Sequence, residues 1–244
     1  MAHADVIRLR AEVAVNLRST TTNPTDRPAR LWVAYSGGLD SAVLLDIVVN
    51  CVRPAGCDVS VAHVNHGISL AADDWAKLCA KVAGRYQLPY RETRLSLVPG
   101  GNLEANAREA RYDFFAEAMD VGDYLLTAHH ADDQLETIFL KLVQGRAFGG
   151  MSMMSQVRGV SVVRPLLEAS RAELMDYAQM QRLEWVEDPS NADTELDRNF
   201  LRHEVLPELV ARWPQLRSKV PELVARQAAL RDIASGEIAR YVHD

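Results

Sequence analysis

Short apolar segments alternate with longer helical segments over nearly half of this chain, and no other feature limits its possible folds as strongly. Such alternation predicts βαβ units, in which parallel strands are joined by crossover helices. We therefore expect an α/β fold whose twisted parallel sheet carries helices on both faces. The expected strands are 31–35, 59–64, 90–97 and 124–128, and the expected helices are 42–52, 71–86, 103–119 and 132–143.

The flanking segments differ from this core in composition. Residues 1–18 suit an amphipathic helix, and the Thr, Asn and Pro residues of 19–28 predict a loop. The stretch 145–159 is rich in Gly, Met and Ser and is also expected to be a loop. Beyond about residue 193 the pattern is mostly helical. We expect an N-terminal helix and loop (1–30), a main α/β domain (31–192) and a helical C-terminal tail (193–244).

Composition favours a soluble cytoplasmic protein. Of 244 residues, 48% are hydrophobic and 25% are charged, which permits a sizeable core. The three cysteines (Cys51, Cys57 and Cys79) are an odd number without a Cys-x-x-Cys pair, so we expect no disulfide framework. No apolar run approaches the roughly 20 residues that span a bilayer, so no membrane partner is expected. The net charge is −6, but the residues from Arg198 onward carry eight Lys or Arg against six Asp or Glu, which permits a polyanionic partner.

The segment Ser36–Ser41 has the composition of a phosphate-binding loop. It follows an apolar strand and opens a helix, where free backbone N–H groups and the helix dipole bind anions. Gly37 and Gly38 allow a positive φ and a close approach to a phosphate. Ser36 and Ser41 add hydroxyl groups, and Ser41 is also a candidate helix cap. Asp40 beside a phosphate suggests bound Mg²⁺. The alternative is an ordinary strand–helix turn.

The chain contains neither Gly-x-x-x-x-Gly-Lys-[Ser/Thr] nor Gly-x-Gly-x-x-Gly. The run Ser36-Gly37-Gly38-Leu39-Asp40-Ser41 instead resembles the Ser-Gly-Gly-x-Asp-Ser signature of the PP-loop ATP pyrophosphatases. This resemblance implies a PP-loop, Rossmann-like fold and the cofactors ATP and Mg²⁺. It also implies a reaction in which ATP is cleaved between its α- and β-phosphates and the substrate is adenylated.

Four further segments form a pattern along the chain: 63–67, 102–112, 127–137 and the run from Arg164 through Asp188-Pro189-Ser190-Asn191 to His203. In order and spacing they resemble the N-terminal catalytic part of the tRNA(Ile)-lysidine synthetase family, and the resemblance covers roughly residues 31–214. It implies that 31–192 form an ATP-binding catalytic domain and that the tail 193–244 begins a tRNA-contacting region. It also implies adenylation of the C2 oxygen of an anticodon cytidine in tRNA(Ile) with a CAU anticodon, followed by attack of free L-lysine to give lysidine, AMP and pyrophosphate. No obligate protein partner is evident.

Three histidines follow predicted strands. Ligands of parallel α/β sheets bind beyond the carboxyl ends of the strands, so His63, His66 and His130 are expected near the phosphate loop. We assign them to ATP binding together with Ser36–Ser41. The alternative for His63 or His66 is a structural hydrogen bond. No Cys or acidic residue stands at zinc-ligand spacing from them.

Asp132, Asp133 and Glu136 place three carboxylates on the first turn of a predicted helix. One reading is stabilisation of the helix dipole on a solvated face. By the resemblance, the three bind the ammonium group of lysine, and Asp133 and Glu136 are also catalytic because they orient the ε-amine. A carboxylate near this amine can also remove its proton, which leaves it nucleophilic.

Arginines complete the expected site. Arg108 lies in a segment that resembles the family's Asn-x-Glu-x-x-x-Arg-x-x-Arg-Tyr, which favours a catalytic, substrate-facing role over a surface ion pair with Glu104. Arg164, Arg198, Asn199 and Arg202 are expected to bind tRNA, with the arginines on its phosphates. The family pattern Leu-x-Arg-Gly is altered here, because Gln144 stands where Arg is expected.

Three other functions fit parts of the sequence. A related PP-loop enzyme thiolates a nucleobase, but that chemistry calls for a reactive Cys, and the three cysteines lie in or near outer helices rather than at strand ends. A ligase for a small metabolite would not need the Arg198–Arg202 segment. A non-catalytic nucleotide- or tRNA-binding protein is suggested by the altered loop, although Asp40, Asp133 and Glu136 are all present.

Overall fold

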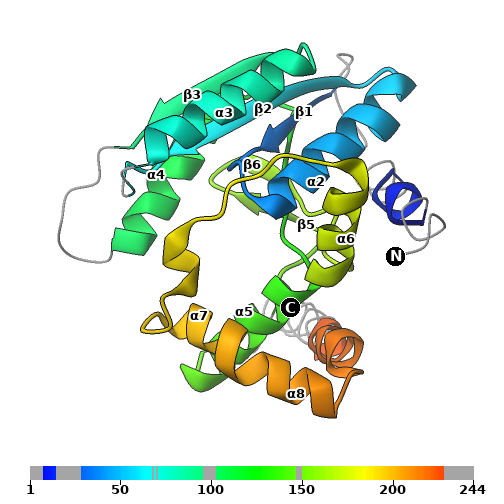
Figure 1. The fold of residues 1–244 in the computed structure, drawn as a ribbon, viewed down its shortest axis with the longest axis vertical. Helices are drawn as coiled ribbons and strands as arrows, with labels where there is room; N and C mark the ends of the chain where they lie inside the picture. The colour runs from blue at the N-terminus through cyan, green and yellow to red at the C-terminus, as the bar shows by residue number, and fades with distance from the viewer. Residues whose placement is uncertain are drawn as a thin grey trace, which may run out of the picture. The chain divides into compact units, whose positions relative to one another are not determined.

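The computed structural model describes residues 8–14, 29–67, 69, 71–95, 103–146 and 150–227 (Figure 1). Residues 8–14 and 216–227 are helical, so parts of the expected N-terminal helix and C-terminal tail lie outside the described residues. The other elements are β1 (Arg30–Ala34), α2 (Leu39–Ile47), β2 (Asp58–Asn65), α3 (Ala72–Arg85), β3 (Tyr90–Arg94), α4 (Leu103–Ala118), β4 (Tyr124–Leu126), α5 (Ala131–Val143), β5 (Met154–Val157), β6 (Val160–Val163), α6 (Arg171–Gln181), α7 (Asp197–Phe200) and α8 (Leu206–Arg212).

The sheet has six strands in the order β3-β2-β1-β4-β6-β5. Every neighbouring pair is parallel except β5 and β6, which form an antiparallel hairpin at one edge. The expected α/β fold is thus confirmed. The prediction of a loop at 145–159 is wrong for Met154–Val157, which form the strand β5. Arg158 and Gly159 turn this hairpin with φ of 50° and 82°. Two positive φ angles are typical of a two-residue hairpin turn, and Arg in place of Asn conceals its usual sequence signal.

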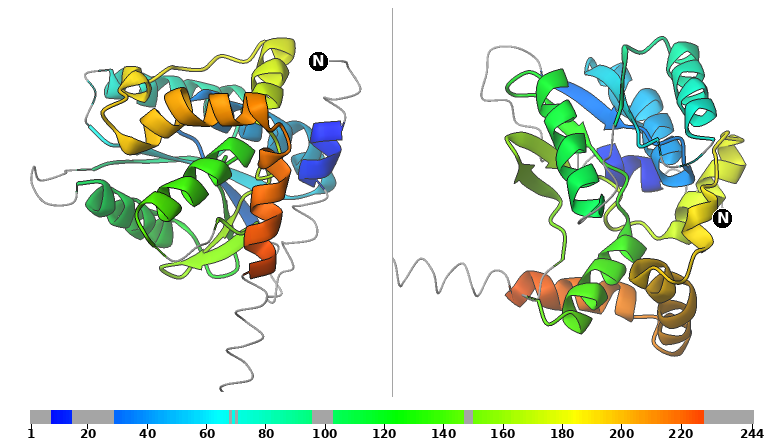
Figure 2. Two further views of the ribbon diagram at one scale, coloured as in Figure 1. Left: turned by 90° about the horizontal axis from the view of Figure 1, so that it is seen from below. Right: turned by 90° about the vertical axis from the view of Figure 1, so that its left-hand side faces the viewer.

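Alternate residues of the central strands pack into separate apolar clusters, one on each face of the sheet. In β1, Val33 joins a cluster with α2, α3 and α6, whereas Trp32 joins a cluster with Tyr112 and Phe115 of α4. This period of two is the geometry of a strand buried on both sides. In the right-hand view of Figure 2, α4 and the pair α2 and α3 stand on opposite sides of the strands. The prediction of helices on both faces is therefore confirmed.

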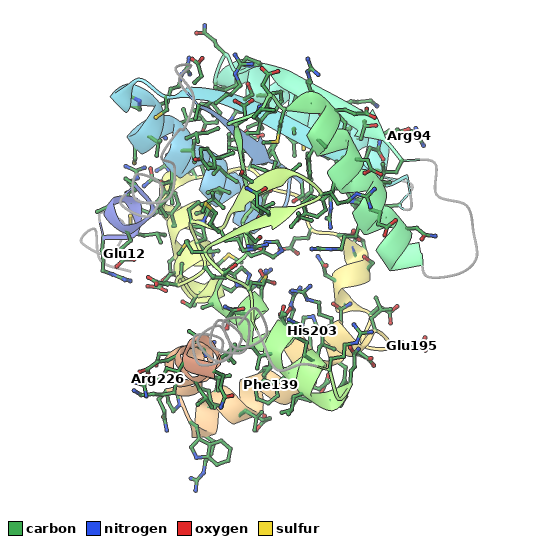
Figure 3. All side chains as sticks on the ribbon, turned by 180° about the vertical axis from the view of Figure 1, so that it is seen from behind. Glu12, Arg94, Phe139, Glu195, His203 and Arg226 are labelled. Carbon is green, nitrogen blue, oxygen red and sulfur yellow. The ribbon has the colours of Figure 1, made fainter. Side chains whose placement is uncertain are left out.

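The chain divides into two compact units, each made of two stretches. The first unit is Met1–His130 with Met153–Asp188, and the second is Ala131–Ser152 with Pro189–Asp244. The expected boundary at 192 lies near one division, but the sequence does not predict that α5 belongs with the C-terminal stretch. Within the second unit, Leu135 of α5 packs with Leu201 and Leu206, and Phe139 packs against this cluster (Figure 3).

Within the described ranges, no helix has the length and apolar character needed to cross a membrane.

Candidate active site

The phosphate loop lies in the first unit, between β1 and α2. Gly37 has a φ of 87°, as expected for a loop that needs glycine. Gly38 is the N-cap of α2 and has no side chain to accept from the first-turn N–H groups, so an anion can serve as their acceptor. Ser41 lies inside the first turn, where its hydroxyl donates to the Gly38 carbonyl at 2.9 Å, so it is not the helix cap. The Ser36 and Ser41 hydroxyl oxygens are 3.0 Å apart.

Close packing holds Gly37 in place. The Gly37 carbonyl accepts a hydrogen bond from the Val186 N–H at 2.9 Å. A Cβ added to Gly37 would lie 3.1 Å from the Cys79 sulfur and 3.4 Å from a methyl carbon of Val186. The loop backbone is therefore fixed by the segment after α6 and by α3, which is the preorganisation that phosphate binding needs.

Cys79 corrects one premise of the sequence analysis. Although it belongs to an outer helix, its sulfur lies against the loop and 3.9 Å from the Tyr35 carbonyl oxygen. Burial raises the pKa of the Cys79 thiol to about 12. Since the thiolate is the nucleophilic form, this cysteine is unreactive near neutral pH. Its position therefore gives no support to thiolation chemistry.

Asp40 lies on the first turn of α2 between two cationic or potentially cationic groups. Its Oδ2 is 3.4 Å from Nη1 of Arg171 and 3.6 Å from Nε2 of His130. A single carboxylate fits Mg²⁺, because protein-bound Mg²⁺ keeps several waters and takes other ligands from substrate phosphates. Among the described residues, no group of three or more His, Cys, Asp or Glu side chains is arranged to hold a metal ion. Asp40 would hold Mg²⁺ here together with water and phosphate oxygens.

His63 is buried beside the loop. Its Nδ1 lies 2.8 Å from the Tyr35 carbonyl oxygen, and because a carbonyl only accepts, Nδ1 carries the proton. Nε2 is buried and has no hydrogen-bond partner among the described residues. Buried polar atoms are usually hydrogen-bonded, so Nε2 of His63 is suited to accept a hydrogen bond from a bound nucleotide. Burial, followed by the charges of Arg111 and His63, lowers the pKa of nearby His66.

Arg108 belongs to a cationic cluster around the buried ring of Tyr112. The guanidinium carbons of Arg108 and Arg111 lie 5.1 and 6.0 Å from the centre of this ring. Arg164 is only 5% exposed, and its Nη1 donates to the Ser155 hydroxyl at 3.0 Å. Burial is the main cause that lowers the pKa of Arg164. Tyr112 raises this pKa, and the charge of Arg108 lowers it further. A tRNA phosphate bound by Arg164 would therefore have to enter a buried position, and this contact is still only a prediction.

The carboxylates Asp133 and Glu136 lie in the second unit, where they pair with the arginines expected to bind tRNA. The Glu136 side chain is 1% exposed and accepts from Nε of Arg198 at 2.7 Å and from Nε of Arg202 at 2.6 Å. Asp133 accepts from Nη2 of the same two arginines at 3.3 and 3.2 Å. Helix α5 therefore presents a carboxylate pair that holds two guanidinium groups. These four residues are hereafter called the charge cluster.

Asp132 and Asn199 have different environments. Asp132 accepts from Nε of Arg217 at 2.9 Å, so it faces the helix of residues 216–227. The Asn199 side-chain amide is buried and donates to the carbonyls of Ser190 and Asp193 at 2.9 and 2.8 Å. A tRNA contact through this amide group would have to replace these two bonds. Neither the lysine role of Asp132 nor the tRNA role of Asn199 is tested by these contacts.

Two positioning residues were missed by sequence reasoning. Arg171 reaches Asp40 from the start of α6, where Ser170 and Glu173 form a capping box whose Ser-x-x-Glu spacing could have marked the helix. Gln134 holds the altered loop: its amide nitrogen donates to the Met151 carbonyl at 2.6 Å and its oxygen accepts from the Met151 N–H at 2.5 Å. Residues 147–149 of that loop lie outside the described residues.

Comparison with known proteins identifies related sequences. Residues 9–209 match the PP-loop domain family. Proteins named tRNA(Ile)-lysidine synthase from Pseudomonas aeruginosa and Methylococcus capsulatus are 45% and 44% identical to the chain over 194 and 193 residues. These alignments cover 78% and 77% of this chain but 44% of each relative, so the chain spans less than half the length of these curated relatives.

A solved structure has a similar fold. The U34-tRNA thiolase of Methanococcus maripaludis, solved with its 4Fe-4S cluster, superimposes with a TM-score of 0.74 at 16% identity. The superposition covers 91% of this chain and 78% of the thiolase chain. At this identity the likeness concerns the fold alone. The family match over most of the chain's length, with the Ser-Gly-Gly-Leu-Asp-Ser loop at the start of α2, shows that the chain belongs to the PP-loop domain family.

Proposed function

We propose that this chain carries the active site of a tRNA(Ile)-lysidine synthetase, which ligates lysine to C2 of a cytidine in the CAU anticodon of tRNA(Ile). The identity to the lysidine synthases supports this proposal. The observation that carries it is the pair Asp133 and Glu136, because these carboxylates hold cationic groups within the second unit. A site that neutralises guanidinium groups has the charge needed to bind the ammonium group of lysine.

The reaction has two steps. In the first, the C2 oxygen of cytidine attacks the α-phosphorus of ATP, the bond to the β-phosphate breaks, and pyrophosphate leaves. The N–H groups at the start of α2 are proposed to bind the phosphates, and the charge of bound Mg²⁺ near Asp40 would neutralise them. Arg108 is proposed to face the substrate and to stabilise the negative charge on the α-phosphate oxygens during this attack.

In the second step, the ε-amine of lysine attacks C2, the C2–O bond breaks, and AMP leaves with that oxygen. Asp133 and Glu136 are proposed to bind the side-chain nitrogen of lysine. Only the neutral amine is a nucleophile, so one of the two carboxylates is proposed to accept its proton. A second candidate function, such as thiolation, has no comparable support, because the cysteine nearest the loop is held as a buried thiol.

Pyrophosphate release and incorporation of labelled lysine test this proposal. We expect both to require ATP, lysine and tRNA(Ile) together, and we expect Asp133→Asn to abolish incorporation of lysine while the protein still binds ATP. Full lysine transfer by Asp133→Asn would show that this carboxylate does not have the assigned role. Pyrophosphate release without tRNA would instead indicate a ligase for a small metabolite. No turnover under any combination would indicate a non-catalytic nucleotide-binding protein.

A cytoplasmic location and the absence of an obligate protein partner remain parts of this proposal. The three cysteines, all free in the structure, are consistent with a reducing compartment.

A further inference from the structure

The carboxylate of Asp46 lies buried in the middle of α2, the helix that begins at the phosphate loop. Its side chain is 7% exposed and accepts hydrogen bonds from the hydroxyls of Tyr177 and Tyr86 at 2.7 and 3.0 Å. A third bond comes from the side-chain amide of Asn50 at 2.8 Å. A buried carboxylate needs such partners, because burial without them is strongly unfavourable. Since Tyr177 belongs to α6 and Tyr86 ends α3, Asp46 connects α2 to both helices.

The N-terminal helical segment, residues 8–14, adds a cation to these bonds. Arg10 donates from Nε to the Tyr177 hydroxyl at 2.8 Å, and its Nη2 lies 3.5 Å from Oδ2 of Asp46. Its guanidinium carbon is 5.3 Å from the centre of the Tyr177 ring, a distance at which a cation is attracted to an aromatic face. The Tyr177 hydroxyl therefore has both a donor, Arg10, and an acceptor, Asp46.

Apolar contacts hold the same segment on the first unit. Leu9 and Val13 are 2% and 0% exposed and belong to the cluster that contains side chains of α2 and α6. Helices in proteins draw most of their stability from the packing of an apolar face rather than from intrinsic propensity. Arg10 and these two apolar side chains therefore hold the segment 8–14 against α2 and α6.

Helices α2 and α6 pack side by side in the first unit (Figure 1). Near their starts, Oδ2 of Asp40 lies 3.4 Å from Nη1 of Arg171. Six residues further along each helix, Asp46 accepts from Tyr177 at 2.7 Å. The second contact helps to set the position of α2, which carries the N–H groups proposed to bind phosphate. A side chain that stabilises the Asp46–Tyr177 bond therefore affects the phosphate loop without touching it.

We infer that the segment 8–14 is part of the ATP-binding unit and that Arg10 is a positioning residue, which stabilises the ATP-competent arrangement of α2 through Tyr177 and Asp46. The inference rests on the proposed function, because ATP must bind at the start of α2. When the segment leaves, the Tyr177 hydroxyl loses its donor and Asp46 loses a neighbouring cation. The ATP-competent state then becomes a smaller part of the population, which raises the apparent dissociation constant.

ATP titration measures the effect of Arg10. Arg10→Met keeps much of the side-chain length but removes the charge and the N–H groups, and we expect its dissociation constant for ATP to rise about fivefold, the effect of one lost hydrogen bond. Tyr177→Phe removes the hydroxyl that links Arg10 to Asp46 and should weaken ATP binding to a similar extent. Because both substitutions break the same link, the double variant should bind ATP little more weakly than either single variant.

Arg158→Met is the matched control for removing an arginine from the first unit. The Arg158 side chain is 47% exposed and pairs with Asp113 at 2.8 Å, and neither residue contacts Asp46 or Tyr177. We expect its affinity for ATP to equal that of the wild type. Urea denaturation of every variant shows whether it is folded.

Hydrogen exchange gives a measurement that a purely structural role for Arg10 would not change. Coupling between two sites is reciprocal, so bound ATP must also hold the segment 8–14 in place. We expect saturating ATP with Mg²⁺ to slow the exchange of amides in this segment about fivefold in the wild type, as the same coupling requires.

The outcomes separate this inference from the proposed function. Weaker ATP binding by Arg10→Met than by Arg158→Met, together with slower exchange of 8–14 in the presence of ATP, supports the inference. If folded Arg10→Met binds ATP as tightly as the wild type, or if ATP leaves the exchange of 8–14 unchanged, the inference is wrong and the proposed function stands. Absence of ATP binding by the wild type overturns both.

Discussion

At the scale of single residues, Gly37 is the position where the phosphate loop tolerates least change. Its φ is 87°, and a Cβ would lie 3.1 Å from the buried Cys79 sulfur. We expect Gly37→Ala to lower the free energy of unfolding by roughly 2 kcal/mol, because it adds steric crowding to a backbone strain of roughly 1 kcal/mol. We also expect weaker ATP binding. Urea denaturation and ATP titration measure the two effects.

Gly56 supplies the matched control for this substitution. Its φ is 90°, but among the described residues other than its chain neighbours no atom lies within 4 Å of an added Cβ. Gly56→Ala should therefore show the backbone strain alone, with ATP affinity unchanged. Equal losses of stability in the two variants would contradict the role given to Cys79 and Val186 in packing the loop.

Because of Cys79, we expect the free energy of unfolding of the first unit to vary with pH in the alkaline range. Burial raises its pKa from 9.0 to about 12, so the folded protein retains a proton that the unfolded chain releases. The stabilisation is complete below pH 9 and declines as the pH rises towards 12. Between pH 8 and pH 10 we expect the wild type to lose about 1 kcal/mol more of its free energy of unfolding than Cys79→Ala. Equal losses in urea denaturation at the two pH values would contradict this.

The sequence predicts which side chains lie together in the candidate site only for residues that directly follow strands. His63 and the phosphate loop are brought together by neighbouring strands, as the parallel sheet predicts. Arg198 and Glu136 lie 62 residues apart, and both were recognised, but with separate partners. Nothing local in a sequence states that two charged segments pair with each other, because that pairing depends on the packing of α5 against α7.

At the scale of elements, α6 is a helix that the sequence analysis did not predict. It has the apolar spacing of a core helix in Leu174, Tyr177 and Ala178, and its capping box precedes them. The strands β1, β2 and β4 were predicted because their largely apolar sequences are typical of strands buried on both sides. The hairpin of β5 and β6 was missed because its strands have four residues each and follow a Gly-rich stretch.

Ser170 offers a test of the start of α6. Its hydroxyl accepts from the Glu173 N–H, and the Glu173 carboxylate accepts from the Ser170 N–H at 2.8 Å. We expect Ser170→Ala to lower the free energy of unfolding by about 1 kcal/mol. Ser218→Ala, at an exposed serine, should change it by less than about 0.5 kcal/mol. Equal effects in urea denaturation would show that the cap contributes little.

At the scale of the whole molecule, each compact unit is assembled from two separate stretches of chain. A chain ended at Asp188 would keep α5 but lack the partners of Leu135, which are Leu201 and Leu206. We expect its α5 amides to lose protection from hydrogen exchange while the amides of β1 and β2 keep theirs. Such a shortened chain should also bind a hydrophobic dye. Unchanged protection of α5 would show that this helix is stable without the C-terminal stretch.

The two outer strands of the described sheet have opposite chemical character. Strand β3 carries Arg91, Glu92 and Arg94 within five residues, whereas β5 reads Met154-Ser155-Gln156-Val157 and has no charge. Outer strands present unpaired backbone groups that can recruit a strand from another molecule, and charged side chains oppose such recruitment. Self-association of this protein under stress is therefore expected to begin at β5 rather than at β3, so a lysine in place of the exposed Gln156 should raise its solubility at high concentration.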